Sequence, residues 1–265
     1  MKLKYAVLAC ALLTLGCGTS TSNLPTQESN SLFSQMTSVP PLANESPTSA
    51  ASLHTSPTSQ SSLFSDLGTL LFRDDFDGSL DSGWEWVRED DGSWSLTAAP
   101  GFMQINARSG DVNKETITNL LLRSIPSGTI QIETKITFQP VANFQFAGII
   151  MYESPSNFVQ AGRAYCEGEN PRCVSDGFYM DYYEGGSFVV PNYAGPFSEN
   201  DTVYLRLIRR ENTYTLQTST DGETWTLRGT TTSNMNPLQI GLVAGQNTSS
   251  VVPAVFDYFE VKSLP

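Results

Sequence analysis

Hydrophobic and polar residues alternate most clearly along Val203–Trp225. Valine and leucine take every second position of its first part, VYLRL, and the same period of two returns in YTLQT. A period of two is typical of β-strands that bury one face. Arg210–Asn212 and Asp221–Gly222 supply residues that favour turns, and glycine there tolerates a positive φ. The stretch therefore predicts a β-meander ending on Trp225, with its strands beside the last strand of the chain.

Short apolar or alternating runs recur along residues 70–265 and predict further strands. Ala147–Ile150 is apolar at every position and predicts a central strand buried on both faces. No window has the period and length of a helix, so we predict an all-β, two-sheet antiparallel sandwich of the jelly-roll type. The predicted strands are Leu71–Arg73, Gly101–Asn106, Thr118–Arg123, Thr129–Phe138, Phe144–Tyr152, Phe158–Ala164, Gly177–Tyr183, Leu238–Ala244 and Ala254–Lys262.

Residues 1–16 have the layout of a secretory signal peptide, with two lysines followed by an apolar run. The run is far shorter than the roughly 20 residues of a membrane-spanning helix. LTLGC, which ends at Cys17, resembles a bacterial lipobox. The resemblance implies lipidation of Cys17 and a membrane-anchored lipoprotein of the cell envelope, and plain secretion is the alternative.

Residues 17–69 are rich in Ser, Thr, Pro, Gln and Asn. Such a segment buries too little apolar surface to offset its conformational entropy, so we predict a disordered linker. The only histidine, His54, lies in it. Histidine-based catalysis and histidine metal sites are therefore not expected in residues 70–265, which have the length of one large domain.

The acidic charge of the chain limits its partners. The formal net charge of −12 disfavours nucleic acid and anionic membrane surfaces, so we expect membrane contact through the lipid anchor only.

Cys166 and Cys173 close a short polar loop, CEGENPRC. In an exported protein such a pair predicts a disulfide, because a metal or redox site of the CxxC type needs closer spacing.

Five motifs, in this order along the chain, carry a family resemblance. They are FRDDFDG from Phe72, SGWEW from Ser82, AGIIMY from Ala147, the Val203–Trp225 stretch, and FDYFEV from Phe256. The domain resembles concanavalin A-like sandwiches of the laminin-G and pentraxin superfamily. It is most similar to the uncharacterised domain family 1349 and to the C-terminal sandwich of family 43 β-xylosidases.

The resemblance implies a structural calcium ion where the two ends of the domain meet. The matching positions are Asp75, the carbonyl of Gly78, and Asp257, with Asp74 and Asp77 in reserve. Carboxylate and carbonyl oxygens are the ligands that calcium prefers. Asp257 alternates in phase with Phe259 and Val261, which predicts a side chain facing the core. The alternative is that Asp257 is satisfied by backbone amides or Arg73, and that the acidic turn is solvated.

FYMDYYEGG, from Phe178, resembles part of the laminarinase motif Glu-x-Asp-x-x-Glu. Asp181 and Glu184 match its last two acids, but Tyr179 stands where the nucleophile belongs. Retaining hydrolysis needs two carboxylates about 5 Å apart, so the missing acid argues against a glycoside hydrolase.

Aromatic residues crowd the same region, and flat rings can stack on sugars while polar neighbours bind hydroxyl groups. We therefore predict a non-catalytic carbohydrate-binding module. The alternatives are a structural or protein-interaction module without a sugar site and, third, a glycoside hydrolase. The predicted glycan-binding residues are Tyr179, Asp181, Tyr183, Glu184, Asn192 and Tyr193.

Overall fold

The computed structural model describes residues 68–167, 173–194, 201–245 and 250–265, without the side chains of 190–194. The predicted signal peptide, Cys17, His54 and nearly all of the predicted linker lie outside these ranges, so those predictions stay predictions. Among the described residues, no helix is long and apolar enough to cross a membrane.

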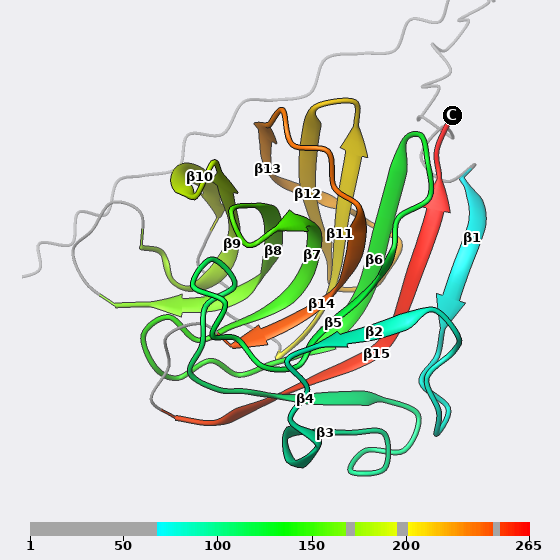
Figure 1. Cartoon of the computed structure of the whole chain (residues 1–265), viewed down its shortest axis with the longest axis vertical. Coiled ribbons are helices and arrows are strands. Elements are labelled where there is room, and N and C mark those ends of the chain that lie inside the picture. The colour runs from blue at the N-terminus through cyan, green and yellow to red at the C-terminus, as the bar shows by residue number, and fades with distance from the viewer. Residues whose placement is uncertain (1–67, 168–172, 195–200, 246–249) are drawn as a thin grey trace, which may run out of the picture. The chain divides into compact units, whose positions relative to one another are not determined.

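The described residues form two antiparallel sheets, which face each other in Figure 1. This confirms the predicted all-β, two-sheet sandwich. The eight-stranded sheet runs β13-β12-β11-β6-β15-β4-β3, and β1 also pairs with β15. Its strands are β1 (Thr69–Asp74), β3 (Trp94–Ser95), β4 (Met103–Ala107), β6 (Ile130–Thr137), β11 (Thr202–Arg210), β12 (Thr213–Ser219), β13 (Thr226–Thr232) and β15 (Val252–Ser263).

The seven-stranded sheet runs β10-β9-β8-β7-β14-β5-β2. Its strands are β2 (Trp84–Val87), β5 (Leu120–Ser124), β7 (Phe146–Ser154), β8 (Asn157–Cys166), β9 (Ser175–Glu184), β10 (Ser187–Ala194) and β14 (Gln239–Gly245). A short 3-10 turn, η1 (Asp91–Ser93), precedes β3. Cys166 and Cys173 form the predicted disulfide, which links the end of β8 to the segment leading into β9.

The Val203–Trp225 stretch forms the predicted meander of β11, β12 and the turn into β13. Its predicted position beside the last strand is wrong, because β6 lies between β11 and β15. Strand β6 pairs with β11 on one side and with β15 on the other. Apolar residues alternate along these strands, so each register brings the apolar faces of neighbouring strands to the same side of the sheet.

The main core lies between the sheets and takes the inward side chains of both, such as Ile132 and Leu207 from the eight-stranded sheet and Leu242 from the seven-stranded sheet. A second apolar cluster covers the outer face of the seven-stranded sheet, where Val112 and Ile117 pack from the segment before β5. The central strand β7 is buried on both faces, as predicted, because Ile149 enters the first cluster and Ile150 the second. The seven-stranded sheet therefore has apolar side chains packed on both of its faces.

Candidate functional site

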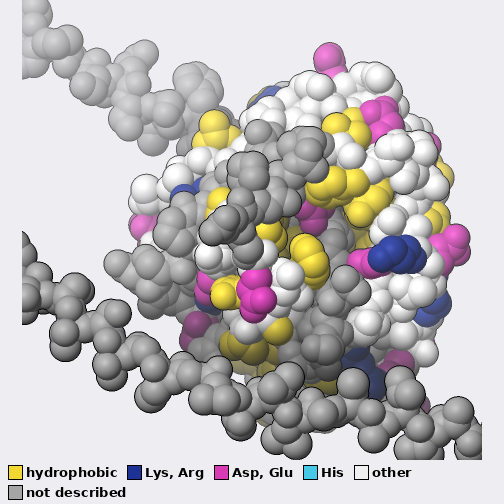
Figure 2. All heavy atoms as spheres, turned by 90° about the vertical axis from the view of Figure 1, so that its left-hand side faces the viewer, with side chains coloured by type: hydrophobic (Ala, Val, Ile, Leu, Met, Phe, Trp, Pro, Cys, Tyr) yellow, Lys and Arg dark blue, Asp and Glu magenta, His cyan; other side chains and the backbone are white. Residues whose placement is uncertain are grey.

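Strand β9 carries four of the six predicted glycan-binding residues. Tyr179, Asp181 and Tyr183 share the outer face of the seven-stranded sheet, since residues two apart on a strand point the same way. Figure 2 shows the side of the molecule where β8, β9 and β10 lie, with hydrophobic and acidic side chains next to one another. The predicted residues are therefore brought together only in part.

Tyr179 is a packing residue of the second cluster, 5% exposed. Its hydroxyl accepts a hydrogen bond from the Val174 amide and donates one to the Ser175 carbonyl, both at 2.8 Å. Burial raises the pKa of Tyr179 above the usual range of tyrosine. Tyr179 holds the segment after the disulfide against the sheet and does not present its ring to a sugar in this structure.

Asp181 lies beside Gln160 of β8, its partner in the strand register. Gln160 donates from Nε2 to Oδ2 of Asp181 at 3.3 Å. Gln160 is fully buried, and within the described part of the chain its Oε1 has no hydrogen-bond partner. A buried acceptor without a donor is uncommon and marks a place where a polar group can be added.

Tyr183 is the predicted ring that remains partly exposed. It stacks on Phe158 with ring centroids 4.8 Å apart and an interplanar angle of 20°. On β10 it contacts Phe188 at 5.3 Å, and Phe188 is 39% exposed. Burial, together with the nearby Asp181, raises the pKa of Tyr183. These stacked rings form an aromatic surface next to the β9–β10 turn.

Glu184 does not join Asp181. Strand β9 pairs with β8 without a register shift, so Asp181 and Glu184, three residues apart, point to opposite faces. The Glu184 carboxylate accepts from the Tyr182 hydroxyl and from the Asn234 amide, the latter at 3.2 Å. This placement, added to Tyr179 at the nucleophile position, argues against hydrolysis by the two-carboxylate mechanism.

Strand β10 carries the other two predicted residues. Tyr193 pairs with Tyr179 and Asn192 with Met180 in the strand register, while their side chains lie outside the description. Phe188, one of the crowded aromatic residues but not among the six predicted glycan-binding residues, lies on this strand opposite Tyr183. The signal that could have found it is the Gly185–Gly186 turn, because a hairpin turn fixes which residues of the two strands face each other.

The two ends of the domain meet as the family resemblance implied, because β1 pairs with β15. Asp74 is 3% exposed, and its carboxylate accepts from the amides of Phe76 and Asp81 and from the indole of Trp84. It therefore has protein donors in place of an ion.

Two further predicted calcium ligands, Asp75 and Asp257, have cationic partners. Asp75 pairs with Arg73, and Asp257 pairs with Lys135, each at 2.7 Å. Gly78 adopts a φ of 86° in the turn, and its amide donates to Phe76. The described residues contain no group of three or more His, Cys, Asp or Glu side chains that could hold a metal ion. These residues do not fit a calcium site as they stand, and the effect of a chelator is the test of the predicted ion.

The prediction that Asp257 faces the core is wrong. The register of β15 against β6 shifts between Phe256 and Phe259, both of which are fully buried. A bulge reverses the phase of a strand, so two buried residues three apart are allowed. Asp257 lies within the bulge, and its side chain is 33% exposed.

Known proteins resemble this chain over the sandwich. The model of a family described as "Beta xylosidase C-terminal Concanavalin A-like domain" matches residues 73–262. A protein of Escherichia coli named "Putative beta-xylosidase" is 28% identical over 172 residues, which are 58% of this chain and 29% of that protein.

Solved structures agree on the fold. The GH43 BlXynB protein of Bacillus licheniformis has a TM-score of 0.64 and 22% identity, and the match covers 72% of this chain and 39% of that one. The xylan beta-1,4-xylosidase of Bacillus halodurans has a TM-score of 0.60 with the same identity and coverages. This chain thus spans less than half the length of these relatives, and the family match is to their C-terminal domain.

Proposed function

Because this chain belongs to the family of β-xylosidase C-terminal concanavalin A-like domains, we propose that it is an exported, lipid-anchored, non-catalytic module that binds a glycan. The observation that supports glycan binding best is the ring pair of Tyr183 and Phe188. Phe188 lies tilted against Tyr183 at an interplanar angle of 58°, and Tyr183 in turn stacks on Phe158. Partly exposed aromatic rings offer apolar surface of the kind that packs on sugars.

Polar groups beside the rings support the same proposal. Asp181 lies on the same face of the sheet as Tyr183, and its carboxylate, which Gln160 holds by a hydrogen bond, is of a type that accepts from hydroxyl groups of a sugar. Asn192 and Tyr193 follow on β10 and stay in the proposed site. Xylan is the first polysaccharide to test, because the names of the relatives refer to xylan and β-xylosidase.

Retention of the purified full-length chain on insoluble xylan tests the proposal. We expect Phe188→Ala and Tyr183→Ala to weaken binding roughly tenfold, the effect of removing a central aromatic contact. Leu238→Ala, which shortens a side chain that is 61% exposed outside the ring pair, is the matched control. Retention on a protein partner and on no polysaccharide would favour the structural or protein-interaction alternative.

The proposed export and anchoring rest on residues 1–17 of the sequence. We expect the chain to be labelled by a radioactive fatty acid in a bacterial host and to fractionate with membranes. Cys17→Ser should abolish both. Labelling that persists in this variant would contradict lipidation of Cys17, and an unlabelled wild-type chain in the medium would support plain secretion.

A further inference from the structure

The outer face of the eight-stranded sheet carries a row of charged residues across neighbouring strands. In the strand register Arg206 of β11 lies opposite Glu133 of β6, Glu133 lies opposite Glu260 of β15, and Glu260 lies opposite Arg73 of β1. Arg206 is 4% exposed, and Glu133 and Glu260 are each 7% exposed. Buried charges on the outward face of a sheet are costly unless each has a partner.

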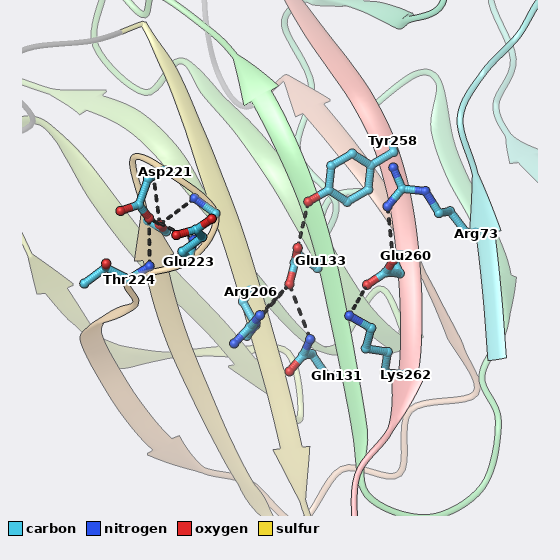
Figure 3. A network of polar contacts seen from close by, with 12 residues as sticks. Arg73, Gln131, Glu133, Arg206, Asp221, Glu223, Thr224, Tyr258, Glu260 and Lys262 are labelled. Carbon is cyan, nitrogen blue, oxygen red and sulfur yellow. Dashed lines mark hydrogen bonds and ion pairs between the residues drawn. The ribbon is translucent and has the colours of Figure 1, made fainter. Parts of the chain in front are cut away.

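Every carboxylate in this row has partners, as Figure 3 shows. Glu133 Oε2 accepts from Nε and Nη2 of Arg206 at 3.0 and 2.8 Å, and Oε1 accepts from the Tyr258 hydroxyl at 2.7 Å. Glu260 pairs with Arg73 at 3.0 Å and with Lys262 at 2.7 Å. Burial and the nearby Glu133 raise the pKa of Tyr258 far above the usual range of tyrosine. The guanidinium of Arg206 is therefore held in one position.

Trp225 lies on that guanidinium. The Cζ of Arg206 is 3.6 Å from the centre of the indole ring, a close cation–π contact. The turn before Trp225 is fixed as well, because Asp221 Oδ1 accepts from the amides of Glu223 and Thr224 at 2.8 and 2.7 Å. The ring is thus positioned from below by an arginine and from one side by a hydrogen-bonded turn, and it remains partly exposed.

Stability alone does not explain this arrangement. A buried ion pair such as Arg206–Glu133 is often no more stabilising than apolar residues of the same size. The indole Nε1 of Trp225 is buried and has no hydrogen-bond partner within the described part of the chain. An unpaired buried donor costs about 1–3 kcal/mol, which a phenylalanine would avoid. The contact with Arg206 and the hydrogen-bonded turn do, however, hold the indole ring of Trp225 in place at the surface.

Polar groups share this face of the sheet with Arg206, on which the indole lies. Tyr204 is two residues from Arg206 on the same face of β11, roughly 7 Å away. In the strand register Tyr204 faces Lys135, whose Nζ pairs with Asp257 at 2.7 Å. Both members of that pair are about one-third exposed, at 31% and 33%. An exposed ion pair offers a donor and an acceptor to the same hydroxyl-rich ligand.

We propose that Trp225 is the stacking platform of a second glycan-binding site, in which a pyranose ring packs on the exposed side of the indole. The hydroxyl groups of the sugar chain reach Tyr204 and the Lys135–Asp257 pair. This inference rests on the proposed glycan-binding function, but it places a site on the opposite sheet from Tyr183 and Phe188. Glu133 and Arg206 are positioning residues, because they act only through the indole.

Calorimetric titration of the full-length chain with xylohexaose, cellohexaose and mannohexaose tests this site. We expect Trp225→Ala to weaken binding of the recognised sugar roughly tenfold or to remove one of two binding events. The sugar affinity of Trp225→Phe should stay within about threefold of wild type, because this variant keeps a flat ring. It also separates loss of the platform from a folding defect in the alanine variant. Leu238→Ala, again, is the control.

The outcomes separate the inference from the proposed function. Equal sugar binding by Trp225→Ala and wild type, alongside loss in Phe188→Ala, would overturn the second site and leave the proposed function intact. Loss in Trp225→Ala with binding retained in Phe188→Ala would support the second site. A wild-type chain that binds none of the three sugars would overturn both.

Discussion

On the outer face of the seven-stranded sheet, apolar side chains such as Phe146 and Ile150 lie beneath a segment that contributes Val112 and Ile117. On the outer face of the eight-stranded sheet, the residues withdrawn from water are charged and are satisfied by one another. Residues on both faces are thus withdrawn from water, on the first by hydrophobic packing and on the second, along the row from Arg206 to Glu260, by paired charges.

The difference affects where a ligand can bind. The apolar face is covered by its own chain, which buries Tyr179 and leaves Tyr183 and Phe188 at the margin. On the charged face the row of residues is satisfied by ion pairs, and Trp225 lies on one of its members, Arg206. Four measurements, taken in order of expected effect, test this contrast.

Glu133→Ala should have the largest effect on the eight-stranded sheet. It leaves the buried Arg206 without its carboxylate, so we expect a loss of about 3–5 kcal/mol in the free energy of unfolding. Asp257→Ala breaks the pair with Lys135, whose members are about one-third exposed, and should cost at most about 1 kcal/mol. Replacing Glu133 and Arg206 together by leucine should recover most of the loss. Equal losses in Glu133→Ala and Asp257→Ala, measured by urea unfolding, would contradict the account of this face.

Ile117→Ala tests the covered face. Ile117 is 1% exposed in the second cluster, and its truncation should cost about 2–4 kcal/mol through lost burial and a residual cavity. The loss should not change with salt concentration, because no charge is involved. Val141→Ala, at a side chain that is 70% exposed, should change stability by less than about 0.5 kcal/mol. A loss of similar size in both variants would mean that Ile117 does not cover the sheet.

Tyr258 gives the eight-stranded sheet a pH dependence. Burial and Glu133 raise its folded-state pKa, whereas an unfolded tyrosine ionises near about 10. The contribution of the neutral Tyr258 hydroxyl to the free energy of unfolding is complete below about pH 10. Above that pH the unfolded state loses the proton first, and the free energy of unfolding falls by up to about 1.4 kcal/mol per pH unit. Alkaline unfolding should therefore be less steep in Tyr258→Phe than in wild type. Identical profiles for the two proteins would show that Tyr258 ionises freely in the folded state.

A chelator should have the smallest effect. The predicted calcium ligands Asp75 and Asp257 are paired with Arg73 and Lys135, so we expect EDTA to leave the melting temperature unchanged. A drop of several degrees in wild type that is absent from Asp257→Ala would restore the calcium hypothesis for the junction of β1 and β15.

Alternation along the chain, together with the continuous apolar run of β7, was enough to predict the fold class and most of the long strands, including β6, β8 and β9. The strands that escaped prediction are the short β2 and β3, and β10 and β13 at the sheet edges. β13 is mostly exposed and threonine-rich, so it shows no periodic apolar face. Edge strands have one partner and less burial, which weakens the hydrophobic signal in their sequence.

The candidate site was harder to predict, because side-chain direction depends on local register. One bulge in β15 turned Asp257 outward, against the alternation of its neighbours. Strand β9 pairs with β8 without a register shift, so the side chains of Asp181 and Glu184 point to opposite faces of the sheet. Their spacing in the sequence nevertheless matched a catalytic motif. Tyr179 is buried in the same cluster as Val112 and Ile117, which are distant in sequence. Such contacts between distant segments leave no local pattern.

Glycan binding without hydrolysis is the central claim, and one assay tests both parts. The full-length chain is incubated with insoluble xylan, and the bound protein and the released reducing sugar are measured on the same sample. We predict that wild type is retained on the polysaccharide and releases no sugar. Released sugar that is lost in Asp181→Asn would contradict the non-catalytic assignment, and a chain that stays entirely in the supernatant would contradict xylan binding.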